Sequence, residues 1–136
     1  MGEPVICVVE DNASDVYLLR LVLEEHHIDC KLLVFSDGEQ ALNFVLQPER
    51  TQPEPSLFIV DLNLPKIDGR EILRHLRSSA LFRTAPVIVW TSSDSERDRQ
   101  ISVSLNANRH VLKPSNVSAF IDLGSVIKEL LPASAS

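Results

Sequence analysis

The sequence has few cysteines and no cluster of residues with the spacing of a zinc site. Only two of its 136 residues are cysteine, and Cys7 and Cys30 form no CxxC pair, so a disulfide framework is not expected. The four histidines do not supply the three or four closely spaced ligands that zinc requires. We therefore expect two free thiols, both buried.

Basic residues are outnumbered, and long apolar runs are absent. Thirteen Lys and Arg against 19 Asp and Glu give a net charge of -6, which argues against nucleic-acid binding, because that affinity comes mainly from Lys and Arg meeting phosphates. The sequence contains no run of about 18 apolar residues, so no membrane span is predicted. The first residues do not form a basic segment followed by a hydrophobic one, so no signal peptide is predicted. These features favour a cytoplasmic protein.

The length of the chain favours one domain. With 136 residues, 44% of them hydrophobic, it can bury one core but not two ordinary ones. No internal repeat or low-complexity segment divides it. We expect a single domain over residues 1–136, with a frayed tail at 132–136.

Short apolar runs alternate five times with segments of helical periodicity. Such runs are typical of parallel strands buried on both faces. Strands are predicted at 5–9, 32–35, 57–60, 87–90 and 110–112. Helices are predicted at 12–26, 39–47 and 71–77, around Ile101 and Leu105, and at 117–131. This alternation predicts a doubly wound α/β fold with helices on both faces of a parallel sheet.

Four of the five predicted strands end in residues with carboxylate, hydroxyl or ammonium groups, which can bind ligands or take part in catalysis. Glu10 and Asp11 follow the first strand, Asp61 the third, Thr91 the fourth and Lys113 the fifth. The carboxyl ends of parallel strands share one edge of the sheet, so these side chains are expected to converge there. Three carboxylates and one ammonium need a counterion, and Mg²⁺ suits such a set.

A carboxylate at this edge can act as a nucleophile toward phosphorus. Asp61 would then form an aspartyl phosphate, with Lys113 and Thr91 as partners of the incoming phosphoryl group. The alternative is that each residue is an ordinary polar strand end. Functional residues at the ends of four strands make that alternative a poor explanation.

Four motifs carry a resemblance to a known family. VVEDN, DLNLPKIDG, PVIVWTSS and VLKP occur in the order and spacing of two-component response-regulator receiver domains, which the chain resembles over about residues 4–131. The resemblance implies a CheY-like, flavodoxin-like (βα)5 fold with strand order 2-1-3-4-5. It also implies that Asp61 accepts a phosphoryl group from a sensor histidine kinase and that Lys113 pairs with the phosphate.

The same resemblance implies a metal site and a switch. Asp11 would ligate Mg²⁺ together with Asp61, Glu10 would do so through water, and Asn63 would contribute its backbone carbonyl. Thr91 would swing toward the phosphate on activation, and the bond before Pro114 would be cis.

His110 departs from the family pattern, in which an aromatic residue on the fifth strand usually couples to the threonine. A rotating imidazole can still switch, and it titrates near neutrality, so output that depends on pH as well as on phosphorylation is one alternative. Loss of the switching role is the other.

The implied partners are proteins. The wording DLNLPKIDGREIL resembles stand-alone regulators associated with bacterial phytochromes, so the kinase is expected to be of that kind. Tyr17, Leu18 and Leu21 either widen the buried face of the first helix or form a docking patch for the kinase. No output domain is expected after Leu131. The signal is therefore expected to leave through a downstream protein or a homodimer, which the apolar last helix would suit, or by onward transfer of the phosphate.

Two other functions compete with a phosphoacceptor switch. A receiver-like interaction module would keep the fold without using phosphorylation, and the intact set around Asp61 argues against it. A phosphohydrolase would need a second carboxylate two residues after Asp61, where the sequence has Asn63. A conventional enzyme is therefore not expected.

Overall fold

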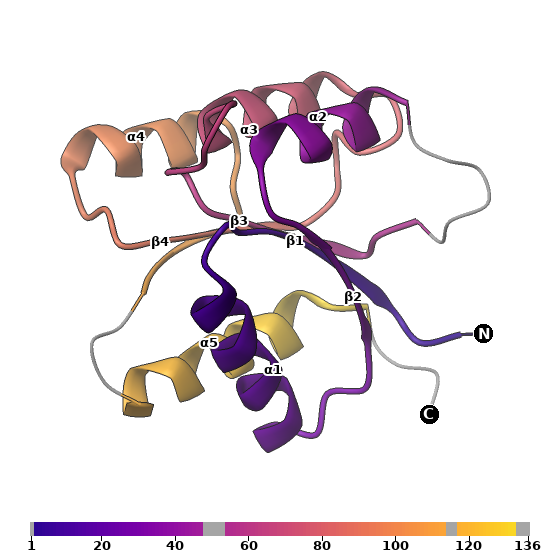
Figure 1. Ribbon diagram of the computed structural model, residues 1–136, viewed down its shortest axis with the longest axis vertical. Coiled ribbons are helices and arrows are strands. Elements are labelled where there is room, and N and C mark those ends of the chain that lie inside the picture. Colours follow the sequence, from indigo (N-terminus) through magenta and orange to yellow (C-terminus); the bar gives the residue numbers. More distant parts are fainter. Residues whose placement is uncertain (1, 48–53, 114–116, 133–136) are drawn as a thin grey trace.

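The computed structural model describes residues 2–47, 54–113 and 117–132, without the side chains of 117–121. Five strands and five helices alternate along the described chain (Figure 1). The strands are β1 (Val5–Val9), β2 (Lys31–Phe35), β3 (Leu57–Val60), β4 (Val87–Thr91) and β5 (Arg109–Leu112). The helices are α1 (Ala13–Glu25), α2 (Gly38–Leu46), α3 (Gly69–Ser78), α4 (Glu96–Ser104) and α5 (Val117–Leu130).

All strand pairs in the sheet are parallel, and the order is β2-β1-β3-β4-β5. This order confirms the predicted doubly wound α/β fold. The register aligns Val9 with Val60 across β1 and β3, so Glu10 and Asp61 leave the sheet side by side. The sheet thus delivers both carboxylates to the same edge before any side-chain contact is considered.

Helices cover both faces of the sheet, as Figure 1 shows: α2, α3 and α4 lie on one face, and α1 and α5 on the other. Alternate residues of β1 serve the two faces. Cys7 and Val9 pack into the core beneath α2 and α3, while Ile6 and Val8 pack toward α1 and α5. Because both faces are covered, the central strands are fully buried, and their polar residues can occur only where the strands end.

The helices begin at side chains that accept hydrogen bonds from free backbone N–H groups. Asn12 caps α1, Asp37 caps α2, Asp68 caps α3 and Ser95 caps α4. All four caps follow on the loops that leave the carboxyl ends of β1, β2, β3 and β4. The capping residues therefore help to fix the loops that surround the site.

The structure corrects one sequence-based prediction of burial. Cys7 is buried but Cys30 is only half-buried, and both thiols are free. Burial raises the pKa of the Cys7 thiol. On α2, Phe44 is buried and Leu46 is exposed. Tyr17 and Leu21 are exposed on α1.

Two further sequence-based predictions fall on parts of the chain outside the description. These are the cis bond before Pro114 and most of the frayed tail, residues 133–136. None of the described helices has the length and apolar character that a membrane span requires.

Gly69 lies directly against the main chain that carries Asp61. A Cβ atom at this position would overlap the Asp61 carbonyl oxygen and press on the Leu62 Cα. The first turn of α3 can approach the end of β3 so closely only because residue 69 has no side chain. Glycine after Asp68 is therefore needed for packing behind the site.

We expect Gly69→Ala to lower the free energy of unfolding by about 2 kcal/mol, because the clash involves backbone that has little freedom to move. Urea denaturation followed by circular dichroism measures this change. Gly2→Ala is the matched control, since nothing lies within 4 Å of a Cβ there. Equal stabilities of the two variants would contradict the packing argument.

Candidate functional site

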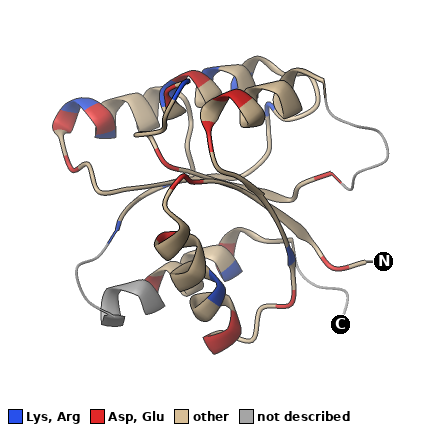
Figure 2. Cartoon of the chain, viewed as in Figure 1, with Lys and Arg blue, Asp and Glu red and all other residues tan. Residues whose placement is uncertain are grey.

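Three carboxylates meet at the carboxyl edge of the sheet. One oxygen from each of Glu10, Asp11 and Asp61 lies within 4.8 Å of the others. Glu10 is 2% exposed and Asp61 6% exposed, whereas Asp11 faces solvent. Figure 2 shows the acidic segment in the loop from β1 to α1 and a basic segment just after β5. The predicted convergence of strand ends is confirmed for these groups.

Lys113 brings the opposite charge into this cluster. Its Nζ lies 2.8 Å from Asp61 Oδ2, 2.6 Å from Glu10 Oε1 and 2.9 Å from Asp15 Oδ2. A lysine ammonium has three N–H donors, so three carboxylate partners saturate it. Sequence reasoning found Lys113, Glu10 and Asp61 but missed Asp15, which lies in the first turn of α1.

The site shifts the titration of its buried groups. Burial raises the pKa of Glu10 to about 7, and the charge of Asp61 adds to the effect, although Lys113 opposes it. Burial by itself would lower the pKa of Lys113. Its hydrogen bonds to Asp61, Glu10 and Asp15 outweigh that effect and hold the pKa above the usual range of lysine. The lysine therefore stays charged, while Glu10 changes protonation near neutral pH.

Both carboxylate oxygens of Asp61 have a fixed donor. The backbone N–H of Asn63 donates to Oδ1 at 3.1 Å, and the Lys113 ammonium donates to Oδ2 at 2.8 Å. These contacts orient the carboxylate at the end of β3. Asn63 thus lies next to Asp61 as expected. The group of Asn63 that contacts the Asp61 carboxylate is its backbone N–H.

Thr91 and His110 both contact Ser93, which links them. Thr91 is completely buried, and its Oγ1 accepts a hydrogen bond from the Ser93 N–H at 3.3 Å. The half-buried His110 ring places Nε2 3.1 Å from the Ser93 carbonyl oxygen and Nδ1 2.8 Å from Ser102 Oγ. Ser93, in the loop from β4 to α4, therefore joins the two predicted switch residues.

A second polar group, which sequence reasoning missed, extends from the same loop. Asp98, on α4, is 5% exposed and accepts from the Arg70 guanidinium at 2.5 and 3.0 Å. The Ser93 hydroxyl donates to its other oxygen. The Ser93 hydrogen bond lowers the pKa of Asp98, with a further contribution from Arg70, against the effect of burial. α3, α4 and the loop after β4 are thereby tied together.

The donor set at the edge suits a hard divalent cation. Carboxylate oxygens are the ligands that Mg²⁺ and Mn²⁺ prefer. Glu10 Oε1 is buried and, apart from its ion pair with Lys113, has no hydrogen-bond donor within the described chain. A buried carboxylate oxygen without a further donor, beside two more carboxylates, is suited to bind a cation or a water molecule bound to that cation. The residues present therefore fit a metal.

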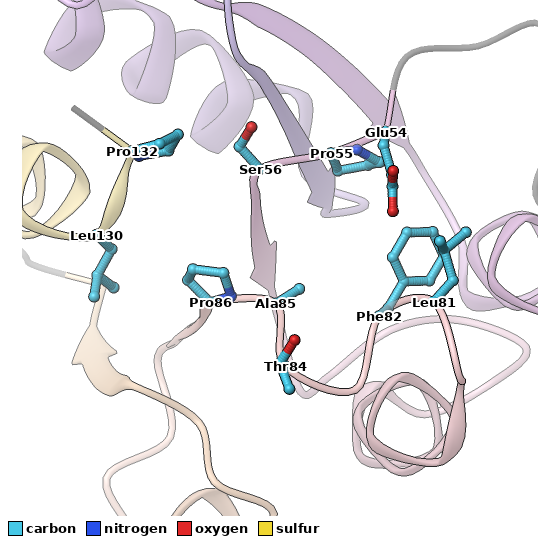
Figure 3. A pocket seen from close by; sticks show the side chains of 10 residues that line it. All are labelled: Glu54, Pro55, Ser56, Leu81, Phe82, Thr84, Ala85, Pro86, Leu130 and Pro132. Atoms are coloured by element: carbon cyan, nitrogen blue, oxygen red, sulfur yellow. The ribbon is translucent and has the colours of Figure 1, made fainter. Parts of the chain in front are cut away.

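A shallow hollow lies at the other edge of the sheet (Figure 3). Ser56 and Pro86, which precede β3 and β4, line it together with Phe82 and Leu130. Glu54 is the one charged residue among the lining side chains. The hollow lacks the convergent polar groups of the opposite edge, so the acidic cluster is the functional site.

Comparison with known proteins agrees with this geometry. Residues 6–123 match the response regulator receiver domain family, and the chain belongs to that family. Response regulator Rcp1 of Synechocystis sp. is 37% identical over 115 residues, which cover 83% of this chain and 78% of the relative.

Two solved structures match almost the whole chain. The phosphorylated cyanobacterial phytochrome response regulator RcpA superposes with a TM-score of 0.86 at 30% identity, covering 99% of this chain and 98% of that one. The Mn²⁺-bound form of Rcp1 superposes with a TM-score of 0.84 at 35% identity, covering 96% and 99%. The family and its two-component signalling class are thereby established, and the similarity extends to phytochrome-associated regulators.

We predict that divalent-metal affinity falls as the pH drops through 7. A metal bound at the acidic cluster would need the ionised form of Glu10, and the raised pKa of about 7 means that protons compete for this carboxylate below that pH. Affinity for Mg²⁺ at pH 6 should be about tenfold weaker than at pH 8. Titration of Trp90 fluorescence measures it, since Lys113 Nζ lies 5.3 Å from the centroid of that ring.

Glu10→Gln provides the control for this pH dependence. The variant should bind Mg²⁺ more weakly but with little change between pH 6 and pH 8, because the titrating carboxylate is gone. An unchanged pH profile in the variant would assign the dependence to another group.

Proposed function

We propose that this protein is a phosphoacceptor switch in which Asp61 takes a phosphoryl group from a sensor histidine kinase. The observation that carries the proposal is the placement of the Asp61 carboxylate, nearly buried, between the Lys113 ammonium at 2.8 Å and two further carboxylates able to hold a cation. A carboxylate positioned in this way has the Lys113 ammonium for one incoming phosphoryl oxygen, and a metal held by the carboxylates would supply positive charge for another.

The transfer needs no further acid or base from this chain. One Asp61 oxygen forms a bond to phosphorus while the P–N bond to the phosphohistidine of the kinase breaks, and the imidazole leaves with the bonding electron pair. Lys113 then pairs with a phosphoryl oxygen. Positioning and charge neutralisation account for catalysis of this kind, so the protein is a substrate with slow self-catalysis and not a conventional enzyme.

Mg²⁺ is the cation that we propose, held by Asp11 and Asp61 directly, by Glu10 through water, and by the Asn63 carbonyl. When bound, it would neutralise charge on the phosphoryl oxygens. The Mn²⁺-bound form of Rcp1 and the acidic cluster support a divalent metal at this edge. The exposed Asp11 is open to solvent and to an entering ion.

The signal would travel from Thr91 through Ser93. If the Thr91 hydroxyl turns toward the phosphoryl group, the Ser93 N–H loses its acceptor, and the loop from β4 to α4 must rearrange. The Ser93 carbonyl and hydroxyl contact His110 and Asp98, so both contacts respond to that movement. The face formed by α4 and β5 would then differ between the two states.

The protonation of His110 would add a second input. Ser102 Oγ donates to the Asp98 carbonyl oxygen at 3.1 Å, so it is free to accept from His110 Nδ1. Nε2 faces the Ser93 carbonyl, another acceptor. Only the imidazolium donates at both ring nitrogens, so protonation tightens this arrangement.

The proposed partners follow from the relatives and from the surface of α1. RcpA is a phytochrome response regulator, which supports a phytochrome-type kinase as phosphodonor. Tyr17 is 63% exposed and Leu21 43% exposed on α1, a helix that starts at the acidic edge and suits kinase docking. A downstream protein or a second copy of this chain would read the phosphorylated form, in the cytoplasm.

A phosphorylation-independent interaction module is the alternative function. The contacts that hold Asp61 favour the switch over the module, because such a module has no need of an oriented carboxylate or of a saturated lysine. Labelling of the protein separates the two.

We expect a small phosphodonor with Mg²⁺ to label the protein slowly, with a bond that is stable in acid and labile in base. Asp61→Asn should lose at least about 90% of the label, because the amide is a poor nucleophile. Phosphate incorporation measured by intact-protein mass spectrometry tests this. Asp29→Asn, an exposed acidic position distant from the site, is the control. Absence of label in the wild-type protein would favour the interaction module, and rapid turnover of many phosphoesters would favour a hydrolase.

His110→Ala should leave labelling of Asp61 within about twofold of the wild-type rate, because the ring contacts none of the acidic residues. It should reduce by about half the change in hydrogen exchange that phosphorylation causes over residues 93–104. His75→Ala, which removes an imidazole from α3, is the matched control. An unaltered exchange response in His110→Ala would remove His110 from the switch.

A further inference from the structure

Asp15 is the partner of Lys113 that the proposed chemistry does not use. Its Oδ2 lies 2.9 Å from Nζ, and its side chain is 18% exposed. It stands outside the group of carboxylates placed to hold a metal, which among the described residues is Glu10, Asp11 and Asp61. The carboxylate group around the metal position therefore does not account for this partly buried ion pair.

The other two partners of Lys113 change during the proposed reaction. Asp61 becomes an acyl phosphate and loses its carboxylate charge, and Glu10 would interact with a bound metal. A lysine held by these two groups alone would lose its anchors when it is needed at the phosphoryl oxygen. Asp15 takes no part in the proposed transfer, so its contact with the ammonium can persist through it.

We propose that Asp15 is a positioning residue, which holds Lys113 at the acceptor site when Glu10 and Asp61 are occupied by metal and phosphoryl group. This role rests on the proposed function. Asp15 acts through the lysine and contacts no reacting atom.

The backbone around Asp15 makes it a rigid support. Its N–H donates to Asn12 Oδ1 at 3.3 Å and to the Asn12 carbonyl at 3.0 Å. The Asn12 N–H in turn donates to Glu10 Oε2 at 3.1 Å. The cap of α1 therefore fixes the distance between Asp15 and the acidic cluster. A carboxylate in the first turn also benefits from the positive end of the helix dipole.

Trp90 borders Lys113 and can report its position. The ammonium lies 5.3 Å from the ring centroid, within the range of a cation–π interaction. Trp90 is the one tryptophan in the sequence, so the emission of the protein comes from this environment. Displacement of Lys113 should alter that emission without any metal or phosphodonor present.

The test compares Asp15→Asn with Asp15→Glu and with Glu24→Gln, which removes an exposed charge from the same helix. In metal-free protein, Asp15→Asn should shift the Trp90 emission, while Glu24→Gln should match the wild type. With saturating Mg²⁺, affinity for beryllofluoride, a stand-in for the phosphoryl group, should fall about tenfold in Asp15→Asn. The Mg²⁺ dissociation constant should change less than about threefold, and Asp15→Glu should recover most of the beryllofluoride affinity.

Several results would overturn the proposal. Wild-type beryllofluoride affinity in Asp15→Asn would remove the positioning role and leave the proposed function intact. An equal loss in Glu24→Gln would reduce the effect to general charge, and a parallel loss of Mg²⁺ affinity would make Asp15 part of the metal site. If the wild-type protein bound no beryllofluoride and took no label at Asp61, the proposed function would fail, and the role of Asp15 with it.

Discussion

The site depends on one ammonium group shared by three carboxylates. Lys113 follows β5, and its partners belong to the end of β1, the first turn of α1 and the end of β3. Removing charges from water is costly, and a buried ion pair repays this only with good geometry and complete hydrogen bonding. Three carboxylates meet that condition for the lysine, but they leave an excess of negative charge for themselves. A bound cation would relieve the excess, and so the same arrangement that stabilises Lys113 prepares the edge for a metal.

Much of this edge follows from short-range sequence pattern. The apolar runs of β1, β3 and β4 predict parallel strands, and the polar residue after each run must then lie at the carboxyl edge. This reasoning places Glu10, Asp61 and Thr91 correctly because a strand has little freedom in where its last residue points. The close packing of Gly69 against the carbonyl of Asp61, by contrast, is known only from the structure.

The contacts that sequence pattern missed join residues of different elements through long or polar side chains. Arg70 and Asp98 lie 28 positions apart, and no local spacing relates them. Residues 101 and 105 suggested an apolar face for α4, yet the residues buried there are Asp98 and Ser102. Periodicity arguments assume that buried means apolar, so they fail for a helix held by hydrogen bonds and an ion pair. Asp15 was missed because acidic residues are common in the first turn of any helix.

Two polar networks thus lie at adjacent strand ends and meet where β4 ends. One, around Lys113, is ionic and would respond to charge added at Asp61 under the proposed function. The other, through Ser93, Asp98 and His110, is built from directional hydrogen bonds and responds to displacement of the loop after β4. Thr91 lies where it could couple the two networks. Its hydroxyl oxygen accepts a hydrogen bond from the Ser93 N–H, and its single proton can be donated to another group. Under the proposed function, rotation of the Thr91 side chain toward a phosphoryl oxygen would move Oγ1 away from the Ser93 N–H, and a change in charge would become a change in shape.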